Sequence, residues 1–160
     1  MVKIGLQIKA VLENITDLEP NDEDFRWYLK LKCMNCGEEP EKWQYVSLQE
    51  KLPLKGGRGE ANFVSKCKLC ARENSVEILT DSFKKYTAED SETFKTIVAF
   101  DCRGLDPTDF SPRAGWRAMG ESSGTKFDEI NLEEKEWVDY DERANLSVSV
   151  CEIEHKFIKV

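Results

Sequence analysis

The stretch Phe25-Arg26-Trp27-Tyr28-Leu29-Lys30-Leu31-Lys32-Cys33-Met34-Asn35-Cys36 carries two signals in succession. Residues 25–32 alternate apolar and polar side chains, which is the period-two pattern of a β-strand with one buried face. The strand pattern runs directly into a Cys-x-x-Cys motif. On a tight turn, two sulfurs at that spacing can bind one side of a metal ion. The stretch therefore predicts a β-strand that ends in half of a metal site.

A second motif of the same spacing, Cys67-Lys68-Leu69-Cys70, follows after an interval of 30 residues. One such motif is weak evidence for a metal site, whereas two in a short chain supply the four thiolates of a tetrahedral structural zinc site. We therefore predict one Zn²⁺ per chain, bound by Cys33, Cys36, Cys67 and Cys70. Four cysteine ligands leave no coordination position for an activated water, so the predicted site is structural rather than catalytic.

The residues around the cysteines favour metal binding over redox chemistry. Gly37 follows the first motif and tolerates the left-handed conformation that such a turn needs, whereas Ala71 makes the second turn less ideal. Redox motifs begin a helix, but here a strand precedes the motif and no amphipathic helix follows it. Basic side chains beside the ligands either offset the net negative charge of the four thiolates and zinc or point into solvent: Lys32, Lys66, Lys68 and Arg72.

Strand-like patterns continue along the rest of the chain, separated by turn-forming residues. They cover residues 4–12, 43–48, 61–66, 76–79, 94–100, 137–140, 146–150 and 152–158. Gly56-Gly57-Arg58-Gly59 lacks the Gly-Lys-Ser/Thr ending of a phosphate-binding loop, so we interpret it as a hairpin or flexible loop. The chain is predicted to be all-β, in two similar small halves of sandwich or barrel type.

A faint internal repeat suggests where the two halves divide. Phe25 precedes Cys33 by eight positions, and Phe94 precedes Cys102 by the same eight. Cys151 also follows an Ala-Asn pair, as Cys67 does. A duplicated unit is the usual meaning of such a pattern. We predict a zinc-binding β unit (1–80), a linker (81–93) and a metal-free β unit packed on the first (94–160), in which Cys102 and Cys151 are the counterparts of Cys33 and Cys67.

Composition indicates an ordered protein outside the membrane. The 160 residues are 40% hydrophobic and 34% charged, and no apolar run approaches the roughly 20 residues that cross a bilayer. Residues 1–9 alternate in polarity, unlike the apolar core of a signal peptide. We therefore expect a cytoplasmic protein, in a reducing compartment where Cys-x-x-Cys pairs are more often metal ligands or redox thiols than disulfides.

The net charge of −8 lies entirely in the second part of the chain. Residues 1–88 hold 14 basic and 14 acidic side chains, whereas residues 89–160 hold 9 basic and 17 acidic. An acidic half repels phosphate backbones, which argues against nucleic-acid binding, including binding through a zinc-ribbon module. Two interpretations stay open: a solvated surface that aids solubility, and a surface that attracts a basic protein partner.

The sequence shows no catalytic constellation. His155 is the single histidine and lies far from the cysteines in the sequence, so we expect a surface or partly packed side chain rather than a catalytic base or ligand. We therefore expect no enzyme activity, and a monomer that binds a protein partner. The alternative is a metal- or thiol-handling protein that exchanges zinc or copper with a partner, because soft thiolates also suit Cu(I).

Several stretches together resemble a known family. They are Cys33-Met34-Asn35-Cys36-Gly37-Glu38, Gly57-Arg58-Gly59-Glu60-Ala61-Asn62, Lys66-Cys67-Lys68-Leu69-Cys70, Phe100-Asp101-Cys102-Arg103-Gly104-Leu105-Asp106-Pro107, Gly115-Trp116 and Trp137-Val138-Asp139-Tyr140-Asp141. With these the chain resembles, over essentially its whole length, the eukaryotic family of small CXXC-motif-containing zinc-binding proteins. The resemblance implies one Zn²⁺ at the four motif cysteines and a mostly β architecture with two similar halves. It implies no enzyme activity.

Overall fold

A computed structural model describes residues 2–54 and 59–160, and nearly all the regular structure in them is β-strand, which confirms the predicted fold class. Residues 56–58 of the glycine-rich stretch lie outside the described part of the chain. Two short 3-10 helices, η1 (Thr80–Ser82) and η2 (Ala88–Asp90), are the only helical elements among the described residues. None of these described helices has the length and apolar character of a membrane span.

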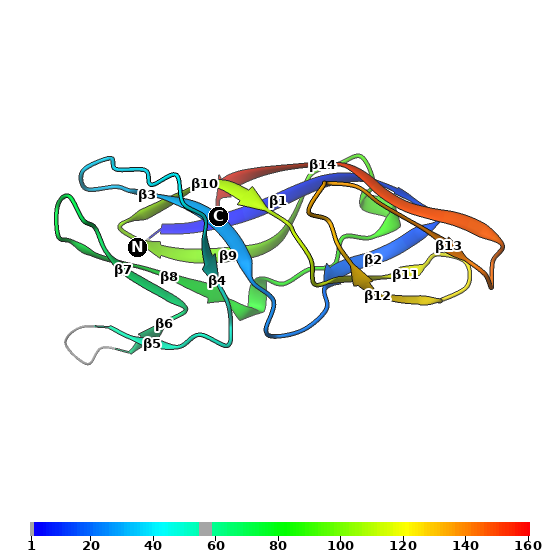
Figure 1. The fold of residues 1–160 in the computed structure, drawn as a ribbon, viewed down its shortest axis with the longest axis horizontal. Coiled ribbons are helices and arrows are strands. Elements are labelled where there is room, and N and C mark those ends of the chain that lie inside the picture. The colour runs from blue at the N-terminus through cyan, green and yellow to red at the C-terminus, as the bar shows by residue number, and fades with distance from the viewer. Residues whose placement is uncertain (1, 55–58) are drawn as a thin grey trace.

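The largest layer is a six-stranded antiparallel sheet (Figure 1). The long strand β1 (Val2–Glu13) is central, and its alternate residues Ile4, Leu6, Ile8 and Ala10 are buried. The strands run in the order β13 (Trp137–Asp141), β14 (Leu146–Lys159), β1, β9 (Lys95–Arg103), β8 (Glu73–Leu79) and β7 (Phe63–Lys66).

Two three-stranded sheets pack on one face of this large sheet. Their orders are β10 (Leu105–Ser111), β3 (Trp27–Cys33), β4 (Gln44–Val46), and β12 (Lys126–Ile130), β11 (Trp116–Gly120), β2 (Ile15–Pro20). Trp27 lies where all three sheets meet, because its ring centroid is 6.1 Å from that of Phe100 in β9 and 6.0 Å from that of Trp116 in β11. A two-stranded sheet of β5 (Leu52–Pro53) and β6 (Glu60–Ala61) completes the described strands.

The sheet orders are symmetric about the centre of the molecule. In the large sheet, β1 and β9 lie side by side, flanked by β14 and β8 and then by β13 and β7. The two small sheets match in the same sense, β10-β3-β4 against β2-β11-β12. The strand series β1-β2-β3-β4-β7-β8 is thus repeated by β9-β10-β11-β12-β13-β14, and the two series are related by a pseudo-twofold axis.

The two halves exchange their first two strands. Strands β1 and β2 belong to the first half of the sequence but pair with β14 and β11 of the second. Reciprocally, β9 and β10 pair with β8 and β3 of the first half. The division into separate units at residues 1–80 and 94–160 remains a prediction. The topology adds that each half supplies strands to sheets of the other half.

The internal repeat exists, but the predicted equivalence of the cysteines is wrong. Cys102 lies in β9, whose counterpart is β1 and not β3, the strand that carries Cys33. Cys102 is opposite Val2 and Cys151 is opposite Val11, nine residues further along β1. At about 3.3 Å per residue, this separates the two thiols by roughly 30 Å. They are not a second pair of ligands.

The predicted linker, residues 81–93, is an ordered part of the fold. Tyr86 is completely buried, and its backbone pairs with that of Leu18. Its hydroxyl lies 2.6 Å from the carbonyl oxygen of Asp90 and 2.7 Å from that of Thr93, and accepts a hydrogen bond from the amide of Ala10 at 3.2 Å. This segment therefore fastens β1 and β2 to the body of the protein.

Candidate metal centre

Both Cys-x-x-Cys motifs form turns with the same backbone hydrogen bonds. The turn that ends β3 is closed by the amide of Cys33 to the carbonyl of Glu38 and the amide of Gly37 to the carbonyl of Cys33, both at 2.8 Å. The turn between β7 and β8 has the same two bonds, from Cys67 to Arg72 and from Ala71 to Cys67, both at 2.9 Å. The two turns project from the same end of the molecule, at the left of Figure 1.

The residue after each second cysteine has a left-handed backbone. Gly37 has a φ of 81°, and Ala71 has a φ of 61°. Glycine adopts this conformation without steric conflict, whereas alanine adopts it at a cost of about 1–2 kcal/mol. The second turn is therefore the more strained of the two, in line with the sequence analysis.

The structure brings together the four cysteines that the sequence predicted as ligands. All four sulfurs lie within 4.8 Å of one another. The Sγ atoms of Cys33 and Cys70 are 3.8 Å apart, and those of Cys36 and Cys67 are 3.5 Å apart. Zinc–sulfur bonds of about 2.3 Å in a regular tetrahedron place sulfurs about 3.8 Å apart. The spacing of these donors thus fits a tetrahedral Zn²⁺.

The electrostatics of the cluster also suit a cation. Hydrogen bonds from the amides of Cys36 and Asn35 lower the pKa of Cys33 to about 6, against the opposing effect of desolvation. The amide of Cys70 likewise favours the Cys67 thiolate, but desolvation and the neighbouring thiols outweigh it and raise the pKa of Cys67 to about 12. Without an ion, therefore, the Cys33 thiol ionises easily and the Cys67 thiol resists ionisation. A divalent cation at the centre removes this conflict.

Two residues that sequence analysis did not identify contact the sulfurs. Asn74, buried in β8, lies with its side-chain nitrogen 3.5 Å from Cys33 Sγ. The thiol of Cys67 donates to a Glu38 carboxylate oxygen at 3.3 Å. Nothing in the local sequence distinguishes Asn74 from a surface asparagine, whereas Glu38 could be noticed only by its closeness to Cys36. Of the basic residues predicted near the site, Arg72 donates to the side chain of Asn35 at 3.4 Å.

The tips of the two turns are open to solvent. Cys33 is buried, but Cys36 is exposed. Met34 and Leu69, each between the two cysteines of its motif, have 61% and 72% of their surface exposed. The two exposed apolar side chains therefore lie beside the four sulfurs, at the tips of the turns.

His155 is remote from the cysteine cluster, as expected. It lies in β14, half-buried between the rings of Phe110 and Phe157. Its Nε2 is 3.3 Å from an Asp109 carboxylate oxygen. Desolvation lowers its pKa below the ordinary value of 6.5, and the carboxylate only partly opposes this effect.

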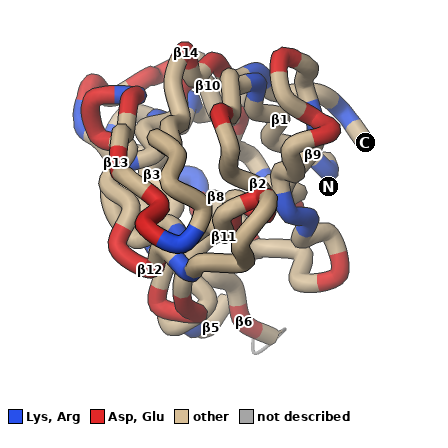
Figure 2. The backbone as a smooth tube through the Cα atoms, turned by 90° about the vertical axis from the view of Figure 1, so that its right-hand side faces the viewer, with Lys and Arg blue, Asp and Glu red and all other residues tan. Residues whose placement is uncertain are grey.

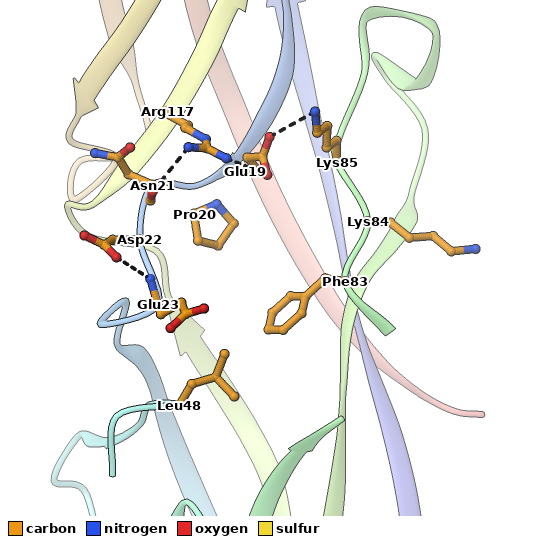
Figure 3. Close-up of a pocket in the computed structure, with 10 residues that line it drawn as sticks. All are labelled: Glu19, Pro20, Asn21, Asp22, Glu23, Leu48, Phe83, Lys84, Lys85 and Arg117. Carbon is orange, nitrogen blue, oxygen red and sulfur yellow. Dashed lines mark hydrogen bonds and ion pairs between the residues drawn. The ribbon is translucent and has the colours of Figure 1, made fainter. Parts of the chain in front are cut away.

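A groove of about 420 Å³ lies between the end of β2 and residues 83–85, on another part of the surface (Figure 3). Phe83 and Leu48 form its apolar side. Glu19 accepts ion pairs from Lys85 and from Arg117, each at 3.4 Å. The described residues that line it include no histidine, cysteine, serine or threonine.

Comparisons with known proteins agree with this geometry. A model of the family described as CXXC motif containing zinc binding protein, eukaryotic, matches residues 5–158. Proteins named CXXC motif containing zinc binding protein from Xenopus laevis and Homo sapiens are each 62% identical over 99% of both chains. The crystal structure of C1orf123 matches with a TM-score of 0.96 and 62% identity, covering 99% of each chain.

A more distant solved structure shares the fold. A hypothetical protein from Plasmodium falciparum matches with a TM-score of 0.89 at 22% identity, covering 99% of this chain and 100% of its own. The family model spans nearly all the residues that build the sheets and both cysteine turns. The chain therefore belongs to the eukaryotic family of CXXC motif containing zinc binding proteins.

Proposed function

We propose that this chain is a non-enzymatic, cytoplasmic protein in which Cys33, Cys36, Cys67 and Cys70 bind one structural Zn²⁺, and that its surface binds a protein partner. The observation that carries the zinc assignment is the tetrahedral spacing of four sulfurs on two matching turns. A centre with four protein ligands has no free position for substrate or water, which supports a structural role.

Zinc in this position would link two parts of the chain that no hairpin joins. One turn ends β3 in a small sheet, and the other joins β7 to β8 at the edge of the large sheet. Structural zinc contributes about 10–16 kcal/mol in small peptides, as much as the whole stability of an ordinary domain. Loss of the ion should therefore unfold at least the end of the molecule that carries the four cysteines.

The surface proposed for the partner is the acidic end opposite the cysteines. Exposed carboxylates cluster on β12, on β13 and in the adjoining loops (Figure 2): Glu121, Asp128, Glu129, Glu133, Glu134, Glu136, Asp139 and Glu142. The negative potential of such a cluster speeds association with a basic protein surface, and this attraction weakens as salt is added. We therefore expect binding to a basic partner that falls with ionic strength.

The zinc assignment is tested by elemental analysis of protein purified without added zinc, together with melting curves before and after a chelator. We expect one zinc per chain and a large loss of stability on chelation. Cys67→Ser should lose the metal, whereas the matched control Cys102→Ser should keep it. A Cys102→Ser protein without metal, or unchanged melting after zinc removal, would refute the structural zinc site.

A second candidate function is metal exchange with another protein. The exposed Cys36 and the exposed apolar tips Met34 and Leu69 favour it, because a partner could approach the sulfurs there. Soft thiolates also bind Cu(I). The rate of zinc transfer to a mild chelator separates the two functions, since a structural site should release zinc slowly. If exchange requires docking at the tips, Leu69→Glu should slow transfer to a metal-accepting protein, whereas Val138→Glu, a change at another exposed apolar side chain at the other end, should not.

A further inference from the structure

Residues 120–125, at the end of the molecule opposite the cysteines, repeat the backbone of the first cysteine turn. The amide of Gly120 donates to the carbonyl of Thr125 at 2.8 Å, and the amide of Gly124 donates to the carbonyl of Gly120 at 2.9 Å. Gly124 has a φ of 73°, close to the 81° of Gly37. This turn joins β11 to β12, the symmetry counterparts of β3 and β4. Gly120 and Ser123 thus occupy the positions of the two cysteines.

Residues 141–146 repeat the second cysteine turn in the same way. The hairpin β13–β14 pairs Tyr140 with Ser147, as β7–β8 pairs Lys66 with Glu73. Asn145 has a φ of 55°, close to the 61° of Ala71. By this register Asp141 and Ala144 take the places of Cys67 and Cys70. Figure 1 shows both turns at the right-hand end of the molecule.

The Asp141 side chain also accepts the same backbone hydrogen bonds as a cysteine sulfur. Its Oδ1 accepts from the amides of Arg143 at 3.1 Å and Ala144 at 3.3 Å. The sulfur of Cys67 accepts from the amides of the residues at the same two positions of its own turn. The hydrogen bond from Ser123, with smaller effects from Thr125 and from these two amides, lowers the pKa of Asp141 against the opposing effect of desolvation. An anion at this position is therefore stabilised as a thiolate would be.

Ser123 matches a cysteine sulfur in the same detail. Its hydroxyl oxygen accepts from the amide of Thr125 at 3.1 Å, as the sulfur of Cys36 accepts from the amide of Glu38. The Ser123 hydroxyl donates in turn to Asp141 Oδ2, in place of the contact between Cys36 and Cys67. Thr125 adds a second hydrogen bond across the two turns, from its hydroxyl to Asp141 Oδ1 at 2.8 Å.

Position 120, the counterpart of Cys33, faces the same cluster of Ser123 and Asp141. A Cβ atom added to Gly120 would collide with Asp141 Oδ2 and would lie 2.6 Å from Ser123 Oγ. A side chain at position 120 would therefore point into the cluster, as Cys33 points toward the other three sulfurs. Gly120 leaves this space to the carboxylate and the hydroxyl, which fill it.

We propose that residues 120–125 and 141–146 have the backbone of a second pair of zinc-binding turns. In these turns, hydrogen bonds among Ser123, Thr125 and Asp141 take the place of the metal ion. This cluster joins β11–β12 to β13–β14, as zinc would join the corresponding strands at the other end. The backbone of this end keeps the geometry of a tetrahedral thiolate site and lacks only its side chains. The cysteine end depends on metal supply, and this end does not.

Restoring the four cysteines tests the proposal directly. In the full chain we would make Gly120→Cys, Ser123→Cys, Asp141→Cys and Ala144→Cys together, which also removes the two groups that a side chain at 120 would meet. Elemental analysis and Co²⁺ titration, read by the absorption of tetrahedral thiolate cobalt, should give two metal ions per chain instead of one. The matched control carries serine at the same four positions and should bind one. A folded four-cysteine protein that binds only one would overturn the proposal.

A second test uses the natural turns and does not depend on the redesigned chain. Asp141→Ala should speed amide hydrogen exchange at Thr125, Arg143 and Ala144 by about 10-fold or more, since each loses a hydrogen bond within the cluster or a turn fixed by it. The amides of the cysteine turns should keep their protection. Glu142→Ala, which removes an exposed carboxylate beside the cluster, is the control. Unchanged exchange in the Asp141→Ala protein would show that the cluster does not hold these turns together.

Discussion

Asn74→Val should weaken zinc binding without weakening the metal-free protein. Asn74 is buried, and its side-chain nitrogen donates to the sulfur of Cys33 at 3.5 Å. In the second half of the fold the same position of the hairpin is held by Val148, which is buried where no metal site has to be supported. The substitution thus gives the zinc end the residue of the metal-free end.

The magnitude follows from two effects of opposite sign. A hydrogen bond to a charged group is worth about 1.5–3 kcal/mol, so its loss should weaken zinc affinity by roughly 10- to 150-fold. In the other direction, the side-chain oxygen of Asn74 is buried without a hydrogen-bond partner among the described residues. Removing such an atom relieves a desolvation penalty of about 1–3 kcal/mol. We therefore expect the metal-free protein to melt at the same temperature or higher.

Competition with a chelator of known affinity measures the zinc affinity, and melting of chelated protein measures the stability without metal. Asn62→Val is the matched control, because Asn62 is also a buried asparagine but accepts from the amide of Ile78 at 2.8 Å and donates to the carbonyl of Glu50 at 3.0 Å. It should lose stability and keep its zinc affinity. Unchanged zinc affinity in Asn74→Val would refute the role assigned to Asn74.

Three further predictions concern backbone strain, the segment 81–93 and the histidine. Ala71→Gly should raise the stability of the zinc-bound protein by about 1 kcal/mol in chemical denaturation, because glycine relieves the left-handed strain at a φ of 61°; no gain would contradict that strain. Tyr86→Phe removes a buried hydroxyl that bonds to the backbone of β1 and of residues 90–93, and should lower the unfolding free energy by about 1–3 kcal/mol, whereas Tyr140→Phe, half-exposed, should change little. The pKa of His155, measured by NMR on the single imidazole, should lie below 6.5. Because the pKa of His155 is lower in the folded state than in the unfolded state, the neutral imidazole contributes stability that is complete above pH 6.5 and is lost as the pH falls through the folded-state pKa. A measured pKa above 6.5 would contradict the burial argument.

The sequence predicts the strands and the cysteine cluster because both depend on local patterns. Alternation at residues 25–32 marks β3, and the spacing of two short motifs is enough to propose four sulfurs around one ion. Local patterns do not predict which residues of the two halves correspond to one another in the internal repeat. Its second pair of turns holds Gly120, Ser123 and Asp141 rather than cysteines, so the similarity lies in backbone conformation and hydrogen bonds. Asn74 escapes notice for a related reason, since its role depends on burial beside a residue 41 positions away.

The exchange of strands between the halves also sets an order of events when the protein is made. Both cysteine turns leave the ribosome before β9 and β10, the strands against which β8 and β3 must pair. A nascent chain therefore presents its four thiols, complete as a set, while the sheets that will hold them are still unfinished. Metal captured at that stage would draw β3 toward the β7–β8 hairpin and prepare the edges that β9 and β10 later join. Conversely, β1 cannot complete its pairing until β14 is made, and β2 cannot pair until β11 is made. The strand β1 therefore precedes the other described strands in synthesis but is among the last to be fully paired.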